Sequence, residues 1–198
     1  MIKVGVTGGI GTGKSTFCQV WEQLGAFVVY ADDFAKHLMI TDSELIARIK
    51  SVFGDKSYFE SGELNRSYLA EEAFKKGRVE ELNAIVHPLL WSRLSELENQ
   101  KEQEGVKIFV KEAAILLQNG RPDDLDLVVI LTADESTRVQ RVIERDNTTE
   151  DSVQGRILKQ QDFAEISHLA DFIVVNNSSL EDLSAKAKEL FYIISSQY

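Results

Sequence analysis

The sequence is short of cysteine and of positive charge. Cys18 is the only cysteine among 198 residues, which excludes an internal disulfide and a metal-thiolate site and is typical of a reducing compartment. The 22 basic residues are outnumbered by 32 acidic ones, so the formal charge is −10. Because nucleic-acid backbones are bound by net basic surfaces, this balance argues against a general nucleic-acid binder.

Long apolar runs are missing as well. The longest, Leu127–Leu131, is far shorter than the ~18 residues that a membrane span requires. Met1–Val6 leads directly into glycines and leaves no apolar region for a signal peptide. We therefore expect a cytoplasmic protein without a membrane partner. The 43% hydrophobic and 27% charged content, with this chain length, predicts one ordinary globular unit.

Short runs rich in β-branched residues recur along the chain, with helical stretches between them. Continuous apolar runs of this kind are typical of strands that are covered on both faces. We therefore predict an α/β fold with a parallel sheet flanked by helices. The predicted strands are Ile2–Val6, Ala26–Tyr30, Val106–Val110, Leu127–Leu131 and Phe172–Val175.

Two segments interrupt this pattern. Apolar residues at helical spacing predict a helical insertion from about Asp42 to Gln100, with a loop at Phe53–Asn65. Within it, Pro88 predicts that a helix ends at Val86, because the residue before proline disfavours the α conformation. The second segment, 135–161, is rich in charge and predicts a helical hairpin with its turn at Asn147–Thr149.

The most informative motif is Gly8–Ser15, which reads Gly-Gly-Ile-Gly-Thr-Gly-Lys-Ser and matches the phosphate loop pattern G-x-x-x-x-G-K-[ST]. A predicted strand precedes it, and a predicted helix follows from Lys14 to about Leu24. In such a loop, backbone N–H groups and the helix N-terminus bind phosphate. Lys14 would reach the β- and γ-phosphates, and the Ser15 hydroxyl would ligate Mg²⁺. The motif predicts a P-loop NTPase fold; a glycine-rich turn without a ligand is the alternative.

Two adjacent carboxylates, Asp32 and Asp33, follow the second predicted strand. In an open α/β sheet, ligands bind beyond the carboxyl ends of the strands, so Asp32 is a candidate general base. The alternative is that one of the two caps a helix beginning at Phe34.

Arg138, Arg141 and Arg145 lie at i, i+3 and i+7, on one face of a predicted helix. Guanidinium groups on one stripe can converge on a triphosphate, as in a kinase lid. The alternative is a solvated charged face, on which Asp134 pairs with Arg138 at i,i+4. We expect the solvated role for Arg138 and the functional role for Arg141 and Arg145.

Taken together, these motifs resemble the dephospho-coenzyme A kinase family, and the resemblance spans nearly the whole chain. The family's phosphate loop is similar to Val6–Ser15. The further matches are Ala31-Asp32, Gly62-x-Leu64-x-Arg66 with Leu69 and Phe74, Leu82-Asn83-x-x-x-His87-Pro88, Arg141-x-x-x-Arg145-Asp146, Arg156-Ile157-x-x-Gln160, and Ala170-Asp171 with Asn176.

The resemblance implies a P-loop kinase with a helical insertion and a helical lid. Its nucleotide-binding core would comprise 1–36, 101–134 and 162–198, its coenzyme A insertion 37–100, and its lid 135–161. The implied reaction uses ATP and Mg²⁺ to phosphorylate the ribose 3′-hydroxyl of dephospho-coenzyme A, giving coenzyme A and ADP. No obligate protein partner is expected.

The resemblance also implies roles for individual residues. Asp32, Lys14 and Arg141 would be catalytic, and Ser15 would bind the metal. The residues expected to bind ATP are Thr7, Gly8, Gly9, Gly11, Thr12, Gly13, Lys14, Ser15, Thr16, Arg145 and Asn176. The residues expected to bind the acceptor are Asp32, Arg66, His87, Glu112 and Arg156. For Glu112, just past the third predicted strand, a solvated acid at a strand end is the alternative.

The sequence departs from the family pattern at Tyr30, Lys36 and Gln118, where the family usually has an acid, an arginine and an acid. One alternative function is another small-molecule P-loop kinase, acting on a nucleoside monophosphate or a sugar acid. A second is a nucleotide-dependent switch. The switch is disfavoured because the sequence contains neither N-K-x-D nor D-x-x-G.

Overall fold

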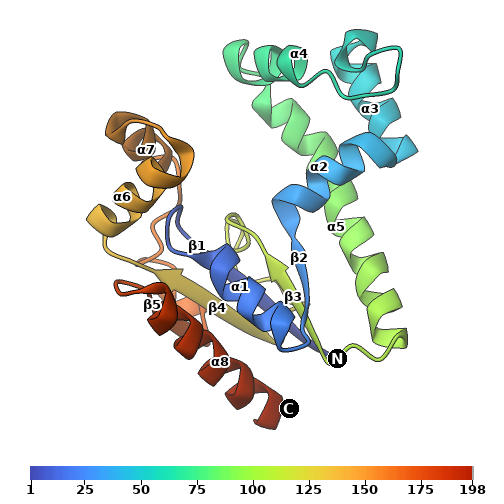
Figure 1. The fold of residues 1–198 in the computed structure, drawn as a ribbon. Helices are drawn as coiled ribbons and strands as arrows, with labels where there is room; N and C mark the ends of the chain where they lie inside the picture. Colours follow the sequence, from blue (N-terminus) through green and yellow to red (C-terminus); the bar gives the residue numbers. More distant parts are fainter. Residues whose placement is uncertain (198) are drawn as a thin grey trace. The chain divides into compact units, whose positions relative to one another are not determined.

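The computed structural model describes residues 1–197 (Figure 1). The chain forms two compact units. The first contains Met1–Tyr30 and the chain from Glu102 onward; the second is Ala31–Lys101. No helix in this described range is long and apolar enough to cross a membrane.

The first unit is built on a parallel sheet of five strands in the order β2-β3-β1-β4-β5. This confirms the predicted sheet. The strands are β1 (Ile2–Gly8), β2 (Phe27–Tyr30), β3 (Ile108–Glu112), β4 (Leu127–Thr132) and β5 (Phe172–Val175). Strand β3 lies two residues later than predicted, because its pairing with β1 starts at Ile108. Glu112 is therefore the last residue of β3 and pairs with Tyr30 of β2.

Helices α1 (Lys14–Gln23) and α8 (Leu180–Gln197) pack together over the sheet (Figure 1). Trp21 of α1 is fully buried, and its ring centroid lies 5.0 Å from that of Phe17 and 5.8 Å from that of Phe191. Its indole nitrogen donates a hydrogen bond of 2.8 Å to the carbonyl of Ala187. Cys18 is a free thiol buried in the same core. This packing fixes the start of α1 at the end of β1.

The charged segment forms the predicted hairpin. Helices α6 (Glu135–Asp146) and α7 (Glu150–Ile157) are joined at residues 147–149. Asn147 adopts the left-handed conformation with φ 48°, which asparagine tolerates better than most residues, and the Thr149 side chain caps α7. A short 3-10 turn, Ser167–Leu169, precedes β5.

The second unit is helical, as predicted for this part of the chain. Its helices are α2 (Ala31–Thr41), α3 (Ser43–Phe53), α4 (Arg66–Ala70) and α5 (Val79–Gln103), with a 3-10 turn at Asp55–Ser57 and a π-helical turn at Glu71–Lys75. Asp42 caps α3 by accepting from the backbone of Leu45, and its other carboxylate oxygen accepts from Arg93 of α5 at 2.7 Å. These hydrogen bonds hold the pKa of Asp42 below its usual value.

Two helix boundaries predicted from the sequence are wrong. Helix α5 continues through Pro88 instead of ending at Val86, because the burial of Leu89, Leu90 and Leu94 offsets the one backbone hydrogen bond that proline removes. Helix α2 begins at Ala31 instead of Phe34, directly after β2. Asp32 and Asp33 therefore lie inside its first turn, where carboxylates favour the positive end of the helix dipole, and neither is its N-cap.

Candidate active site

A backbone cradle opens between β1 and α1. Gly13 precedes the helix in the left-handed conformation with φ 92°, and no side chain caps the first turn. The first N–H groups of an α-helix have no partner within the helix, so they are available to an anion here. The loop thus has the geometry that the phosphate-loop motif requires.

Glycine is required at two loop positions by both conformation and contact. Gly11 has φ 80°, and a Cβ atom there would lie 2.6 Å from the Arg138 carbonyl oxygen. At Gly13, a Cβ would lie 2.6 Å from the Asn176 side-chain nitrogen. The loop is therefore packed closely on both sides, by α6 and by the end of β5.

Buried polar side chains hold the loop in shape. The Thr12 hydroxyl donates to the Gly9 carbonyl at 2.8 Å, and Asn176 donates to the Thr12 carbonyl at 2.9 Å. Thr7, Thr12 and Asn176 are all buried. In this conformation Thr12 and Asn176 stabilise the loop from behind, whereas the Thr7 hydroxyl donates to the Ala114 carbonyl at 3.4 Å.

Lys14 folds over the loop. Its Nζ donates to the carbonyls of Gly8 at 2.9 Å and Gly9 at 3.2 Å and lies 3.9 Å from Glu112 Oε1. Both side chains are almost buried, with exposures of 12% and 11%. The structure therefore brings the predicted catalytic lysine and Glu112 together at the sheet end. Burial is the main cause that raises the pKa of the nearby Cys18 thiol, and the Glu112 charge adds to it.

Ser15 and Thr16 follow in the first turn of α1, with Ser15 exposed and Thr16 half-buried. Among residues 1–197, no group of three or more His, Cys, Asp or Glu side chains is arranged to hold a metal ion. A metal at this loop would therefore take few protein ligands, which is the usual arrangement for Mg²⁺ bound with nucleotide phosphates.

The helical hairpin contacts the phosphate loop at two places, and both contacts involve Ile10. Ile10 packs against a cluster formed by Val139, Val142 and Val153. Where the hairpin returns to the core after α7, the Gln160 side-chain oxygen accepts a hydrogen bond of 2.9 Å from the Ile10 backbone N–H. The base of the hairpin is therefore docked on the phosphate loop.

The stripe of arginines is divided among three surroundings. Arg138 lies beside the loop, with Nη1 2.7 Å from the position that a Gly9 Cβ would occupy. Arg141 instead donates to the carbonyls of Asn176 and Ser178, each at 2.9 Å. Arg145 points to Asp146, which it contacts at 2.7 Å. Only Arg138 of the three lies against Gly9, although the sequence favoured the other two.

Asp146 also accepts from Arg156 at 2.9 Å, so it joins α6 to α7. Hydrogen bonds from Arg145 and Arg156 lower the pKa of Asp146 to about 2. Arg145 was predicted to bind ATP and Arg156 to bind the acceptor. In this conformation both instead pair with Asp146 and so connect α6 to α7.

The remaining predicted site residues belong to the second unit. Asp32 is exposed in the first turn of α2 and has no hydrogen-bond or ion-pair partner in the described chain, whereas Asp33 accepts from Lys36 at 2.7 Å. Arg66 is exposed at the start of α4, and His87 is half-buried within α5. No hydrogen bond among described residues joins Asp32, Arg66 and His87 to one another.

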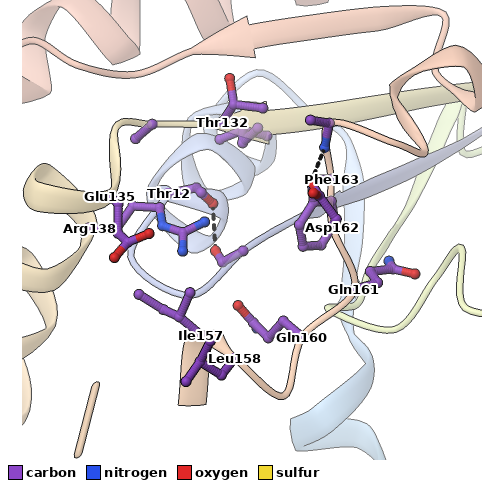
Figure 2. A pocket seen from close by; sticks show the side chains of 14 residues that line it. Thr12, Thr132, Glu135, Arg138, Ile157, Leu158, Gln160, Gln161, Asp162 and Phe163 are labelled. Atoms are coloured by element: carbon purple, nitrogen blue, oxygen red, sulfur yellow. Dashed lines mark hydrogen bonds between the residues drawn. The ribbon is translucent and has the colours of Figure 1, made fainter. Parts of the chain in front are cut away.

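A cavity of about 460 Å³ opens between the loop and the hairpin (Figure 2). Arg138 and Gln160 reach into it, and neither had a predicted site role. Gln160 belongs to one of the motifs that resemble the family, but the sequence does not show that its side chain contacts the loop. The helical spacing of the arginines likewise does not show which of them lies beside the loop. The lining residues are Gly9, Thr12, Leu131, Thr132, Ala133, Glu135, Arg138, Ile157, Leu158, Gln160, Gln161, Asp162, Phe163 and Ala164.

Comparison with known proteins gives matches over almost the full length. The family model described as dephospho-CoA kinase matches residues 2–182. A dephospho-CoA kinase from Salinibacter ruber is 39% identical over 195 residues, which cover 98% of each chain.

Solved structures have the same fold. A protein from Thermus thermophilus is 27% identical, with a TM-score of 0.75 over 96% of each chain. A dephospho-CoA kinase from Campylobacter jejuni is 24% identical, with a TM-score of 0.67 over 97% of this chain and 96% of its own.

Proposed function

Since this chain belongs to the dephospho-CoA kinase family, we propose that it transfers the terminal phosphoryl group of ATP to the ribose 3′-hydroxyl of dephospho-CoA, giving CoA and ADP. The observation that carries the chemistry is the phosphate loop, where the uncapped start of α1 and the Lys14 amine meet within one short segment. Phosphoryl transfer depends mainly on positioning and charge stabilisation, which these groups supply.

We propose that Lys14 turns from the carbonyls of Gly8 and Gly9 toward the β- and γ-phosphates when ATP binds. Glu112 lies 3.9 Å from the amine and balances its charge while the phosphates are absent. The N–H groups of Gly13, Lys14 and Ser15 would then bind phosphate oxygens, as expected at a helix N-terminus.

Mg²⁺ fits the residues present. The exposed Ser15 hydroxyl in the first turn of α1 would hold it together with phosphate oxygens and water. Bound there, the ion would neutralise charge on the β- and γ-phosphates.

Asp32 is proposed as the base that orients the acceptor hydroxyl and accepts its proton. Two features support this role: it has no partner in the described chain, and it follows the carboxyl end of β2 by two residues. Asp33 is held by Lys36 and is less suited.

We further propose that segment 37–100, with Arg66 and His87, binds the acceptor and that segment 135–161 acts as the lid over ATP. In this assignment 1–36, 101–134 and 162–198 form the nucleotide-binding core. Arg141, held on Asn176 and Ser178, would act on the loop through Asn176.

The test is to incubate the purified protein with Mg-ATP and dephospho-CoA and to measure CoA and ADP by chromatography and mass spectrometry. AMP and shikimate serve as competing acceptors. We expect turnover only with dephospho-CoA. Equal or faster turnover of AMP or shikimate would contradict the proposal.

A further inference from the structure

Arg138 stands out among the described arginines because a buried nitrogen of its side chain has no hydrogen-bond partner. Its guanidinium makes no hydrogen bond or ion pair with any residue from 1 to 197, and its Nε atom is buried without a partner. Glu135, one turn earlier, lines the same cavity but forms no ion pair with it. A buried guanidinium nitrogen without an acceptor is costly, so a ligand that supplies acceptors would bind it favourably.

The place of this side chain indicates which ligand group it meets. Arg138 Nη1 lies beside Gly9, and Lys14 Nζ lies 3.2 Å from the carbonyl oxygen of the same residue. Two cations therefore approach one segment of the phosphate loop from α6 and from α1. Because a phosphate-loop lysine reaches the β- and γ-phosphates, a terminal phosphate held by Lys14 would lie within the segment that Arg138 also approaches.

The other arginines of the stripe are engaged. Arg141 makes two bonds of 2.9 Å to carbonyls, and Arg145 is paired with Asp146. The position of Arg138 is fixed by its own backbone, since its carbonyl oxygen and Cα atom pack against Gly11. Gln160 tethers the other end of the hairpin to Ile10.

We propose that Arg138 is a catalytic residue of the lid, which contacts the terminal phosphate of ATP and stabilises it during transfer. This rests on the proposed function. In that step a bond forms between the acceptor oxygen and the γ-phosphorus, while the bond from that phosphorus to the β–γ bridging oxygen breaks. ADP leaves with the electron pair, the hydroxyl proton passes to the base, and Arg138 faces the transferring group.

The experiment compares wild type with Arg138→Gln, which keeps length and polarity but removes the charge. We expect kcat for CoA formation to fall by about 10²–10³, the usual effect of removing one group aimed at developing charge. Affinity for β,γ-methylene ATP, measured by calorimetry without turnover, should fall about tenfold. Affinity for ADP should change less than twofold, because ADP lacks the terminal phosphate.

Two further variants separate this role from a structural one. Arg138→Lys should recover part of the lost kcat, because it restores a charge without the planar guanidinium. Lys188→Gln removes an exposed charge on α8, outside the lid, and should leave kcat and both affinities within twofold. Thermal unfolding verifies that each variant is folded.

The proposal is overturned if Arg138→Gln lowers kcat less than tenfold, or weakens ADP binding as much as binding of the ATP analogue. The second result would place Arg138 at another part of the nucleotide. If wild type forms no CoA, the proposed function fails, whereas the two affinities still test the contact of Arg138 with the terminal phosphate.

Discussion

Replacing Gly11 by alanine should separate the phosphate loop from the hairpin. The new Cβ would lie 2.6 Å from the Arg138 carbonyl oxygen and 2.9 Å from its Cα atom, so α6 or the loop has to move. The φ of 80° adds backbone strain. Left-handed strain costs about 1–2 kcal/mol and overpacking typically about 1–3 kcal/mol, so we expect a total loss of about 2–5 kcal/mol.

Two other glycines provide matched controls for the same chemical change. Gly25 has φ 100° but nothing within 4 Å of its added Cβ, so Gly25→Ala should cost only the strain, about 1–2 kcal/mol. Gly155 lies within α7 with open space around it, so Gly155→Ala should be neutral or stabilise by up to about 1 kcal/mol. Only Gly11→Ala combines strain with contact.

Urea unfolding measures these differences in a Trp91→Phe background, so that fluorescence reports on Trp21 in the core of the sheet unit. Initial rates of CoA formation are measured on the same proteins. We expect Gly11→Ala alone to lose most activity, since both Arg138 and the loop N–H groups are displaced. If Gly11→Ala is no less stable than Gly25→Ala and retains its activity, the docking of α6 on the loop is refuted.

Three further outcomes follow from the same geometry. Lys14→Ala should remain folded by circular dichroism yet lose about 10²–10³ in kcat, because Lys14 carries charge toward phosphate; near-normal kcat would remove its assigned role. Asp32→Asn should lower kcat by about 10²–10⁴ with ATP affinity little changed, whereas Asp33→Asn should retain turnover. If kinetics and calorimetry show instead that Asp33→Asn is the inactive variant, Asp33 and not Asp32 is the base. Arg145 and Arg156 lower the pKa of Asp146 to about 2, so its stabilisation of the hairpin is present above the unfolded-state pKa and is lost as pH falls toward 2. The difference in urea midpoint between wild type and Asp146→Asn should therefore shrink from pH 6 to pH 2, and a constant difference would exclude the ion pairs as its cause.

The phosphate loop could be predicted because its information is local. Gly11 and Gly13 take the left-handed conformations for which glycine is suited, and the strand before them and the helix after them are visible as patterns. The hairpin turn at Asn147 is likewise set by residues beside it in the chain. These features need no knowledge of distant contacts.

The path of α5 through Pro88 depends on contacts that sequence patterns do not show. A proline lowers the stability of a helix locally, yet Leu89, Leu90 and Leu94 are buried on the far side of it, and that burial determines the outcome. Similarly, the spacing of Arg138, Arg141 and Arg145 places them on one helix face but does not specify their partners. Small differences in direction along α6 send them to the loop, to the residues that follow β5, and to Asp146.

The charge balance of the chain also indicates a ligand-binding role for Arg138. With 32 acidic and 22 basic residues, carboxylates are abundant as partners for the basic side chains. Arg78, Arg93 and Arg121 are each paired in this way. Arg138 differs because no carboxylate in the described chain neutralises it, although acidic residues are abundant. An acidic protein that binds a triphosphate needs local positive charge kept apart from its own carboxylates, and the position of Arg138 beside Gly9 meets that requirement at the loop itself.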